Sequence, residues 1–345
     1  MKGVYKIENS MKEFQKRQLD IALGKAIIIN MEDVEVENVN WLWYPYIPFG
    51  KITVIQGDPG NGKTTFILAV ASIVTNGLSF PTTEENIEPA NIIYQTAEDG
   101  LADTIKPRLL QYGADCKRVF VIDDSYKNLT LDDLRIEEAI TKLNAKMLVI
   151  DPLQAFLGAD VDMHRANEIR PIFKRLSDVA QRTGCAMIII GHMNKTSGVK
   201  GIYRGLGTID ITAAARSVLL LGKDPNNPNI RAIIPIKSSL APEGQAIAFE
   251  LGENVAFKWL GLCDLTIDEL LAQPKAERKR IVDDAKLLLS ELLQEHSMPS
   301  EEVLTLAKES GISERTLYTA KKELGIASVK LNDVWHFDKI ARLQT

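Results

Sequence analysis

The sequence has few cysteines and no long apolar run. Its 3 cysteines, Cys116, Cys185 and Cys263, are far apart and form no C-x-x-C pair. We therefore expect reduced thiols and a cytoplasmic protein, without a disulfide framework or a zinc site. Apolar runs such as 26–29 and 187–190 are far shorter than the roughly 20 residues of a membrane-spanning helix. The N-terminus also lacks the apolar region of a signal peptide, so no membrane partner is expected.

An excess of basic residues is also missing. Lysine and arginine total 41, aspartate and glutamate total 46, and the net charge is −5. Such a chain has no global attraction to nucleic acid, so any binding to it must come from local patches. The 45% hydrophobic and 25% charged residues are typical of a globular protein, and 345 residues suit two domains.

Short apolar strands alternate with amphipathic helices between residue 51 and about residue 192. This pattern predicts an α/β fold, with a mostly parallel sheet that helices cover on both faces. The strand-like runs at 217–221, 231–236 and 246–251 have no clear helices between them and predict antiparallel extensions of that sheet. The expected strands are 51–56, 91–96, 118–122, 146–151 and 185–191, and the expected helices are 63–75, 100–112, 131–144 and 165–183.

Changes in composition suggest four segments. We expect an N-terminal arm at 1–38, with a short helix at 11–23, and a large domain at 39–262. A linker at 263–280, whose pattern is charged and helical from residue 270, would lead to a small domain at 281–345. The aromatic run at 41–48 has two readings: it could stack on an adenine ring, or it could pack rigidly at a domain edge.

Residues 57–65 fit the phosphate-loop motif G-x-x-x-x-G-K-[ST], between a predicted strand and a predicted helix. Glycines let successive backbone N–H groups turn toward an anion, and the helix N-terminus adds partial positive charge. Lys63 would reach the β- and γ-phosphates of ATP, and the Thr64 hydroxyl would bind Mg²⁺. The predicted nucleotide-binding residues are Gly57, Asp58, Pro59, Gly60, Asn61, Gly62, Lys63, Thr64 and Thr65.

Two later strands end in acidic residues. Asp151 closes the apolar strand 146–151, where it would hold Mg²⁺ beside the nucleotide. Glu98 follows the strand 91–96 and is the candidate base for the attacking water, whereas Asp99 is expected to cap the next helix. The alternative, in which both acids only cap that helix, stays open.

A third strand leads to His192, which would sense the γ-phosphate. It is followed by a glycine-rich basic stretch, 195–207. The cations of this stretch could meet DNA phosphates or the nucleotide of a neighbouring subunit. Its candidate functional residues are Lys195, Lys200, Tyr203 and Arg204.

Together these motifs resemble the RecA-like P-loop ATPases, and most closely the RepA-type hexameric replicative helicases, over about residues 39–262. The resemblance implies a RecA-like fold, a ring of subunits, and catalytic roles for Lys63, Glu98, Asp151 and His192. It also implies an arginine that reaches the neighbouring active site, which falls on Arg204 first and on Arg216 second. Related ring helicases often carry Lys-x-Arg on a late strand, but residues 237–239 here are Lys-Ser-Ser.

Residues 302–318 look like the two helices and the glycine turn of a winged helix-turn-helix. Residues that could face DNA are Arg315, Thr316, Thr319, Lys321 and Lys322. Residues 274–345 contain 12 basic and 12 acidic residues, so a domain that docks on protein stays open as an alternative.

The sequence thus predicts an ATP-hydrolysing oligomeric motor with Mg²⁺ as cofactor. Its DNA would be single-stranded at the core loops and double-stranded at the winged helix. The competing hypothesis is an ATP-dependent DNA-binding regulator or loader that switches with the nucleotide and does not unwind DNA.

Overall fold

The structure is a computed structural model. It describes residues 23–338, except residues 27, 160, 193–208, 253–254, 272–274 and 295. The chain divides into two units, residues 1–40 and 41–345, which are described separately below. The expected helix at 11–23 lies almost entirely outside the described residues.

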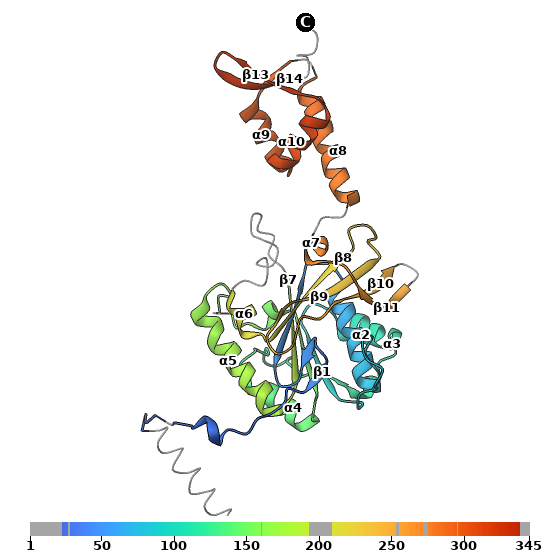
Figure 1. Ribbon diagram of the computed structural model, residues 1–345, viewed down its shortest axis with the longest axis vertical. Helices are drawn as coiled ribbons and strands as arrows, with labels where there is room; N and C mark the ends of the chain where they lie inside the picture. Colours follow the sequence, from blue (N-terminus) through green and yellow to red (C-terminus); the bar gives the residue numbers. More distant parts are fainter. Residues whose placement is uncertain are drawn as a thin grey trace, which may run out of the picture. The chain divides into compact units, whose positions relative to one another are not determined.

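A nine-stranded sheet forms the centre of the second unit (Figure 1), in the order β11-β10-β9-β8-β3-β7-β6-β4-β5. The strands from β8 to β5 pair in parallel, and β9, β10 and β11 continue the sheet in antiparallel fashion. The predicted α/β class is confirmed, although β8 was expected to be antiparallel. The bounds are β3 Ile52–Gly57, β4 Ile92–Thr96, β5 Val119–Phe120, β6 Met147–Asp151, β7 Ala186–His192, β8 Ser217–Lys223, β9 Ile230–Ser238, β10 Ala246–Gly252 and β11 Val255–Cys263.

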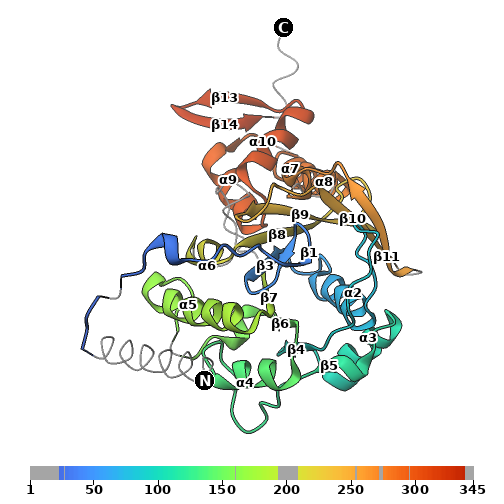
Figure 2. The same cartoon turned by 60° about the horizontal axis from the view of Figure 1, so that its bottom comes forward.

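Helices cover both faces of this sheet. Figures 1 and 2 show α2 (Lys63–Asn76) and α3 (Lys106–Gln111) on one side, and α4 (Leu134–Leu143) and α5 (Ala166–Thr183) on the other. Alternating residues of β3 supply both cores. Ile55 joins the cluster on the α2 side, and Ile52 and Val54 join the cluster on the α5 side. Because every residue of β3 is buried, the strand before the phosphate loop is firmly fixed.

Several elements differ from the sequence-based expectation. Helix α6 (Ile209–Ala214) and strand β11 were not predicted, and the expected helix 100–112 is a π-helix, Leu101–Ile105, followed by α3. A short helix α7 (Ile267–Leu270) lies inside the predicted linker, and α8 (Lys275–Leu292) begins six residues before the predicted helix. The charged part of the linker is thus helical from Lys275, as its pattern predicts, whereas α7 was not expected.

The aromatic run packs as a rigid corner. Strands β1 (Trp41–Trp43) and β2 (Ile47–Pro48) pair antiparallel, and Trp43 is 1% exposed. The Trp43 ring stacks on Phe80 with centroids 4.7 Å apart, and its Nε1 donates to Thr82 Oγ1 at 2.9 Å. These contacts favour the packing interpretation, because a buried indole is not available to an adenine ring.

The C-terminal residues have their own hydrophobic cluster, which includes Leu289, Val303, Leu317 and Phe337. Helices α9 (Ser300–Glu309) and α10 (Glu314–Glu323) follow α8, and a three-stranded sheet has the order β12-β14-β13. The strands are β12 Met298–Pro299, β13 Ala327–Leu331 and β14 Val334–Asp338. The turn at 332–333 has positive φ at both residues, as a tight hairpin requires.

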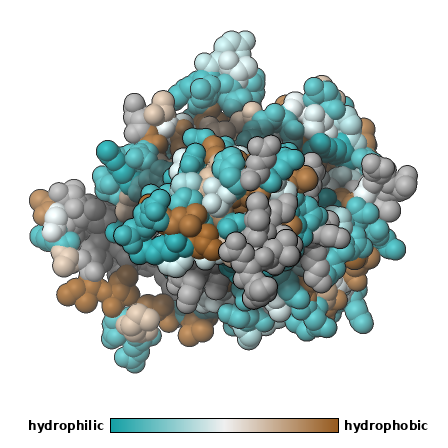
Figure 3. Space-filling view, turned by 90° about the horizontal axis from the view of Figure 1, so that it is seen from above, coloured by the Kyte–Doolittle hydropathy of each residue, from teal (hydrophilic) through white to brown (hydrophobic). Residues whose placement is uncertain are grey.

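The surface is mixed in character. Figure 3 shows one face of the molecule, where hydrophobic residues occur in small groups among hydrophilic ones. Across the described residues, no helix combines the length and the apolar character needed to cross a bilayer.

Candidate nucleotide site

The phosphate loop joins the end of β3 to the start of α2, as the motif predicts. Gly60 and Gly62 have φ of +75° and +94°, which side-chain-bearing residues rarely adopt. A Cβ atom on Gly62 would also lie 2.8 Å from Leu251 Cδ1, and one on Gly57 would lie 2.2 Å from the Leu221 carbonyl oxygen. The glycines therefore allow both the turn of the loop and its close contact with the late strands.

Lys63 is the buried cation of this loop, with 5% exposure. Its Nζ donates to the carbonyl oxygens of Gly57 at 2.8 Å and of Asp58 at 3.0 Å. Burial lowers the pKa of Lys63, and the nearby carboxylates of Asp151, Asp58 and Glu98 oppose that shift. The ammonium group is thus held inside the loop, where a phosphate would provide the countercharge.

Asp151 ends β6 and is 6% exposed. Its Oδ2 accepts two hydrogen bonds, from Thr64 Oγ1 at 2.8 Å and from the Tyr94 hydroxyl at 2.8 Å. Burial raises the pKa of Asp151, and these two hydrogen bonds lower it in part. A threonine hydroxyl and a carboxylate are hard oxygen ligands, so this pair fits Mg²⁺ that is otherwise held by nucleotide phosphates and water. With Mg²⁺ bound, the ion would neutralise phosphate charge.

Tyr94 is a site residue that the sequence analysis missed. It lies on β4, next to β6 in the sheet, and is fully buried. Burial raises the pKa of Tyr94 well above its usual value, and the negative charge of Asp151 raises it further. Tyr94 therefore stays a neutral donor that orients the carboxylate. The available signal was a tyrosine inside a predicted buried strand, because a buried tyrosine hydroxyl usually has a hydrogen-bond partner.

We expect Tyr94→Phe to weaken the binding of Mg²⁺ at the site. Loss of one hydrogen bond to Asp151 should raise the Mg²⁺ concentration for half-maximal hydrolysis about tenfold, as for other residues that orient metal ligands. Calorimetric titration of Mn²⁺ into the ADP complex measures the same loss without turnover. Tyr126→Phe is the matched control because Tyr126 is 99% exposed. Equal metal affinity in both variants would contradict this role for Tyr94.

Glu98 and Asp99 follow β4 at the same edge of the sheet as Asp151. The backbone pairing continues past the strand, since Ala97 N donates to the Asp151 carbonyl at 3.2 Å. Glu98 is exposed. Its charge opposes the lowering of the Lys63 pKa by burial, and it adds to the raising of the Asp151 pKa. Asp99 does not cap the helix as expected: the N-cap residue is Gly100, and Asp99 forms an ion pair with Arg108 at 3.6 Å. The π-helical turn after Gly100 moves the helix start away from Asp99.

His192 is the last residue of β7, and its backbone is in register with Gly57 of β3. The third predicted strand therefore ends at the phosphate-loop edge. Lys195, Lys200, Tyr203 and Arg204 lie outside the described residues.

Arg216 and Lys237 lie at the opposite edge of the sheet from the phosphate loop. Arg216 precedes β8, and its carbonyl oxygen accepts from Ser239 N at 3.0 Å. Lys237 Nζ donates to three carbonyl oxygens at the end of α6, those of Thr212 at 2.7 Å, Ala213 at 3.1 Å and Ala215 at 2.8 Å. The lysine of the Lys-Ser-Ser segment thus caps a helix.

The C-terminal candidates differ in exposure. Arg315, Thr319 and Lys322 are exposed on α10, and Thr316 N donates to the capping residue Ser313 at 3.2 Å. Lys321 Nζ donates to Ser328 Oγ at 2.5 Å and lies 4.4 Å from the centroid of the Phe337 ring. Lys321 is therefore engaged within its own segment, where burial lowers its pKa.

Part of this chain is similar in sequence to DNA repair proteins named RadA. The DNA repair protein RadA of Streptococcus pneumoniae is 22% identical over 187 residues, which are 54% of this chain and 40% of RadA. RadA of Bacillus subtilis is 23% identical over 154 residues, 44% of this chain and 30% of RadA. The chain thus spans less than half the length of these relatives.

Solved structures to which this chain is similar include a DnaB-like replicative helicase studied with primase. It is 14% identical, covers 63% of this chain and 58% of the helicase chain, and has a TM-score of 0.48. The KaiC-like protein PH0186 of Pyrococcus horikoshii is 18% identical with a TM-score of 0.44, over 66% of this chain and 98% of PH0186.

The family model described as an AAA domain matches residues 23–198, just over half of the chain. This range includes the phosphate loop, Glu98, Asp151 and His192. With the strand–loop–helix geometry around Lys63, the match identifies the chain as a member of the AAA domain family, with a P-loop ATPase core.

Proposed function

We propose that this ATPase is a motor that acts on DNA, similar to the RepA-type replicative helicases. The observation that carries the proposal is the meeting of Lys63, Thr64 and Asp151 at one edge of the sheet, with Glu98 on the adjoining strand end. The phosphate loop is enough to hold a nucleotide. Hydrolysis also needs a group that activates water, and the Glu98 carboxylate is the candidate for that role.

In this proposal each site residue has a separate role in ATP hydrolysis. Lys63 and the loop N–H groups bind the phosphates, and Thr64 and Asp151 hold the metal ion. Glu98 orients the attacking water and accepts its proton, which is favoured by its exposed position at the strand end. His192 senses whether the γ-phosphate is present, and a change in its position is passed to the residues that follow β7. Arg204 of a neighbouring subunit supplies positive charge in trans, with Arg216 as the alternative.

The DNA part of the proposal rests on the relatives and on local charge. The named relatives are a DNA repair protein and a replicative helicase. In this chain, Lys195, Lys200 and Tyr203 would contact single-stranded DNA, and residues 281–345 would act as a winged helix on duplex DNA. Arg315, Thr316 and Lys322 are the proposed duplex contacts, because Lys321 already has partners within its segment.

We expect single-stranded DNA to stimulate ATP hydrolysis severalfold, and the chain to displace a strand from a forked duplex when ATP is supplied. Lys200→Ala and Arg204→Ala separate the two loop roles. The former should lower DNA stimulation, whereas the latter should lower hydrolysis with and without DNA. If the hydrolysis rate did not change with DNA and no strand were displaced, the motor hypothesis would be rejected. The result would favour the loader that switches with the nucleotide.

A further inference from the structure

Gln56, the residue before the phosphate loop, has a buried amide group without a hydrogen-bond partner. It is 0% exposed, and neither its Nε2 nor its Oε1 bonds to a described residue. Gln95 is also buried one residue before the end of its strand, but its amide donates to and accepts from the backbone of Ile122, both at 3.0 Å. An unpaired buried amide is unfavourable, so the contrast indicates that Gln56 gains partners in another state of the site.

The neighbours of Gln56 in the sheet leave room for its amide on one side. Its side chain is on the α5 face, as are those of Ile52 and Val54, because side chains alternate along a strand. There it lies between Leu220 of β8, which is a buried apolar residue, and Gly191 of β7, which has no side chain. The amide can therefore extend across Gly191 toward the far side of β7.

The far side of β7 faces β6, and the pairing of these strands ends before β7 does. Ala186 N donates to the residue before β6 at 2.9 Å, so Ile190 and His192 also direct their backbone groups toward β6. The register with β6 ends at Ile189, and Pro152 has no N–H to donate to the Ile190 carbonyl. The described part of β6 thus offers no ladder partner to the Ile190 carbonyl or to the His192 N–H.

A second unpaired amide oxygen lies next to this strand end. The 3-10 helix η4 (Leu153–Phe156) follows β6 and contacts both β6 and β7. It carries Gln154, whose Oε1 is buried and has no hydrogen-bond partner among the described residues. The amide of Gln56 supplies two donors and an acceptor, which match the acceptors and the donor at the end of β7.

We propose that Gln56 is a positioning residue that bonds the end of β7 when ATP is bound. Its Nε2 donates to the Ile190 carbonyl and to Gln154 Oε1, and its Oε1 accepts from the His192 N–H. These bonds hold His192 where it meets the γ-phosphate, so the inference rests on the proposed role of His192 as the sensor. Because the amide gains partners only in this state, it adds to the preference of the site for ATP over ADP.

The test measures this preference without turnover and without DNA. Calorimetric titration gives the affinities of a nonhydrolysable ATP analogue and of ADP for the full chain and for Gln56→Met, which keeps the length of the side chain. We expect the ratio of the two affinities to fall about tenfold, because only the analogue loses affinity. The nucleotide-free variant should unfold about 2 to 4 °C above the parent chain, since an unpaired amide is removed.

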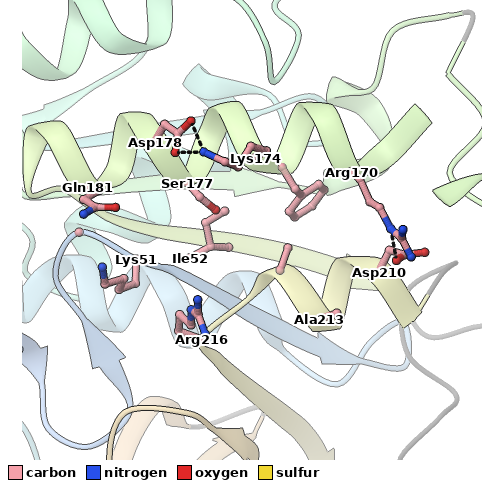
Figure 4. A pocket seen from close by; sticks show the side chains of 13 residues that line it. Lys51, Ile52, Arg170, Lys174, Ser177, Asp178, Gln181, Asp210, Ala213 and Arg216 are labelled. Carbon is pink, nitrogen blue, oxygen red and sulfur yellow. Dashed lines mark hydrogen bonds and ion pairs between the residues drawn. The ribbon is translucent and has the colours of Figure 1, made fainter. Parts of the chain in front are cut away.

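Two control variants carry similar changes elsewhere and should keep the parental ratio. Thr53→Val removes another buried unpaired group from β3, the Thr53 hydroxyl. Gln181→Met replaces an exposed glutamine of α5 at the opposite edge of the sheet. There Gln181 and Lys51 line a cavity of about 430 Å³ (Figure 4). His192→Ala, measured in parallel, should lower the ratio and tests the sensor by itself.

The outcomes separate the role of Gln56 from the proposed function. If the ratio is unchanged in Gln56→Met but lowered in His192→Ala, only the role of Gln56 fails; if it is unchanged in both, the sensor fails as well. A lower unfolding temperature for Gln56→Met would also overturn the inference, since the amide would then be bonded already, for instance to an internal water.

Hydrogen exchange of the parent chain tests the same contact without a variant. The ATP analogue should slow exchange in the peptide that contains residues 186–192, because the His192 N–H becomes bonded, and ADP should not. Equal exchange with the two nucleotides would overturn the inference.

Discussion

Lys63→Met is expected to lower ATP hydrolysis about a thousandfold and to weaken ATP binding. The ammonium group is the one buried cation inside the described phosphate loop, and its loss leaves the β- and γ-phosphates without that charge. Methionine keeps the length of the buried stem, so the core beside α2 should stay filled. Steady-state hydrolysis and the binding of a fluorescent ATP analogue measure the two effects.

The control for this experiment is Lys127→Met, since the Lys127 side chain is 79% exposed and lies away from the loop in the sequence. It should retain the hydrolysis rate of the parent chain. Thermal unfolding of both variants checks the fold, because Lys63 also donates to two loop carbonyls. If the folded Lys63→Met chain hydrolysed ATP at the parental rate, the phosphate loop could not be the catalytic site.

Glu98→Gln is expected to lower hydrolysis by about two to four orders of magnitude while ATP binding stays close to that of the parent chain. Glutamine has the same shape but cannot accept the proton of the attacking water. ATP should therefore remain bound and uncleaved. Single-turnover hydrolysis of radiolabelled ATP, with binding measured in parallel, separates the chemical step from affinity.

Asp99→Asn provides a neighbouring control with the same chemical change. Asp99 pairs with Arg108, so its loss should affect the local helix and change hydrolysis only a few fold. Equal rates for Glu98→Gln and the parent chain would remove Glu98 as the base. That result would favour a nucleotide switch over a motor.

The local part of the site could be predicted from the sequence. Residues 57–65 combine a motif with a strand before it and a helix after it, and the strand-end acids follow from apolar runs of the right length. Parallel strands bring their carboxyl ends to one edge, so Asp151 and the residues after β4 were expected beside the loop. The structure confirms this for the Thr64–Asp151 contact.

The remaining features depend on contacts between distant segments. The Tyr94 hydroxyl is functional only because β4 and β6 are neighbours, which no local pattern shows. Strand β11 has a register shift and glycine at 261, so its alternation is weak. The capping of α6 by Lys237 joins residues more than 20 positions apart. Sequence periodicity records local geometry and has little information on such pairs.

The contact of Lys237 with three carbonyl oxygens bears on how relatives of this chain are recognised. In an alignment, a lysine at this strand position could be taken for the first residue of a trans-acting Lys-x-Arg pair. Here the fold alone accounts for the lysine, since the last carbonyls of α6 need a donor. The lysine by itself is therefore no evidence for a trans-acting pair, and a catalytic arginine has to be sought independently.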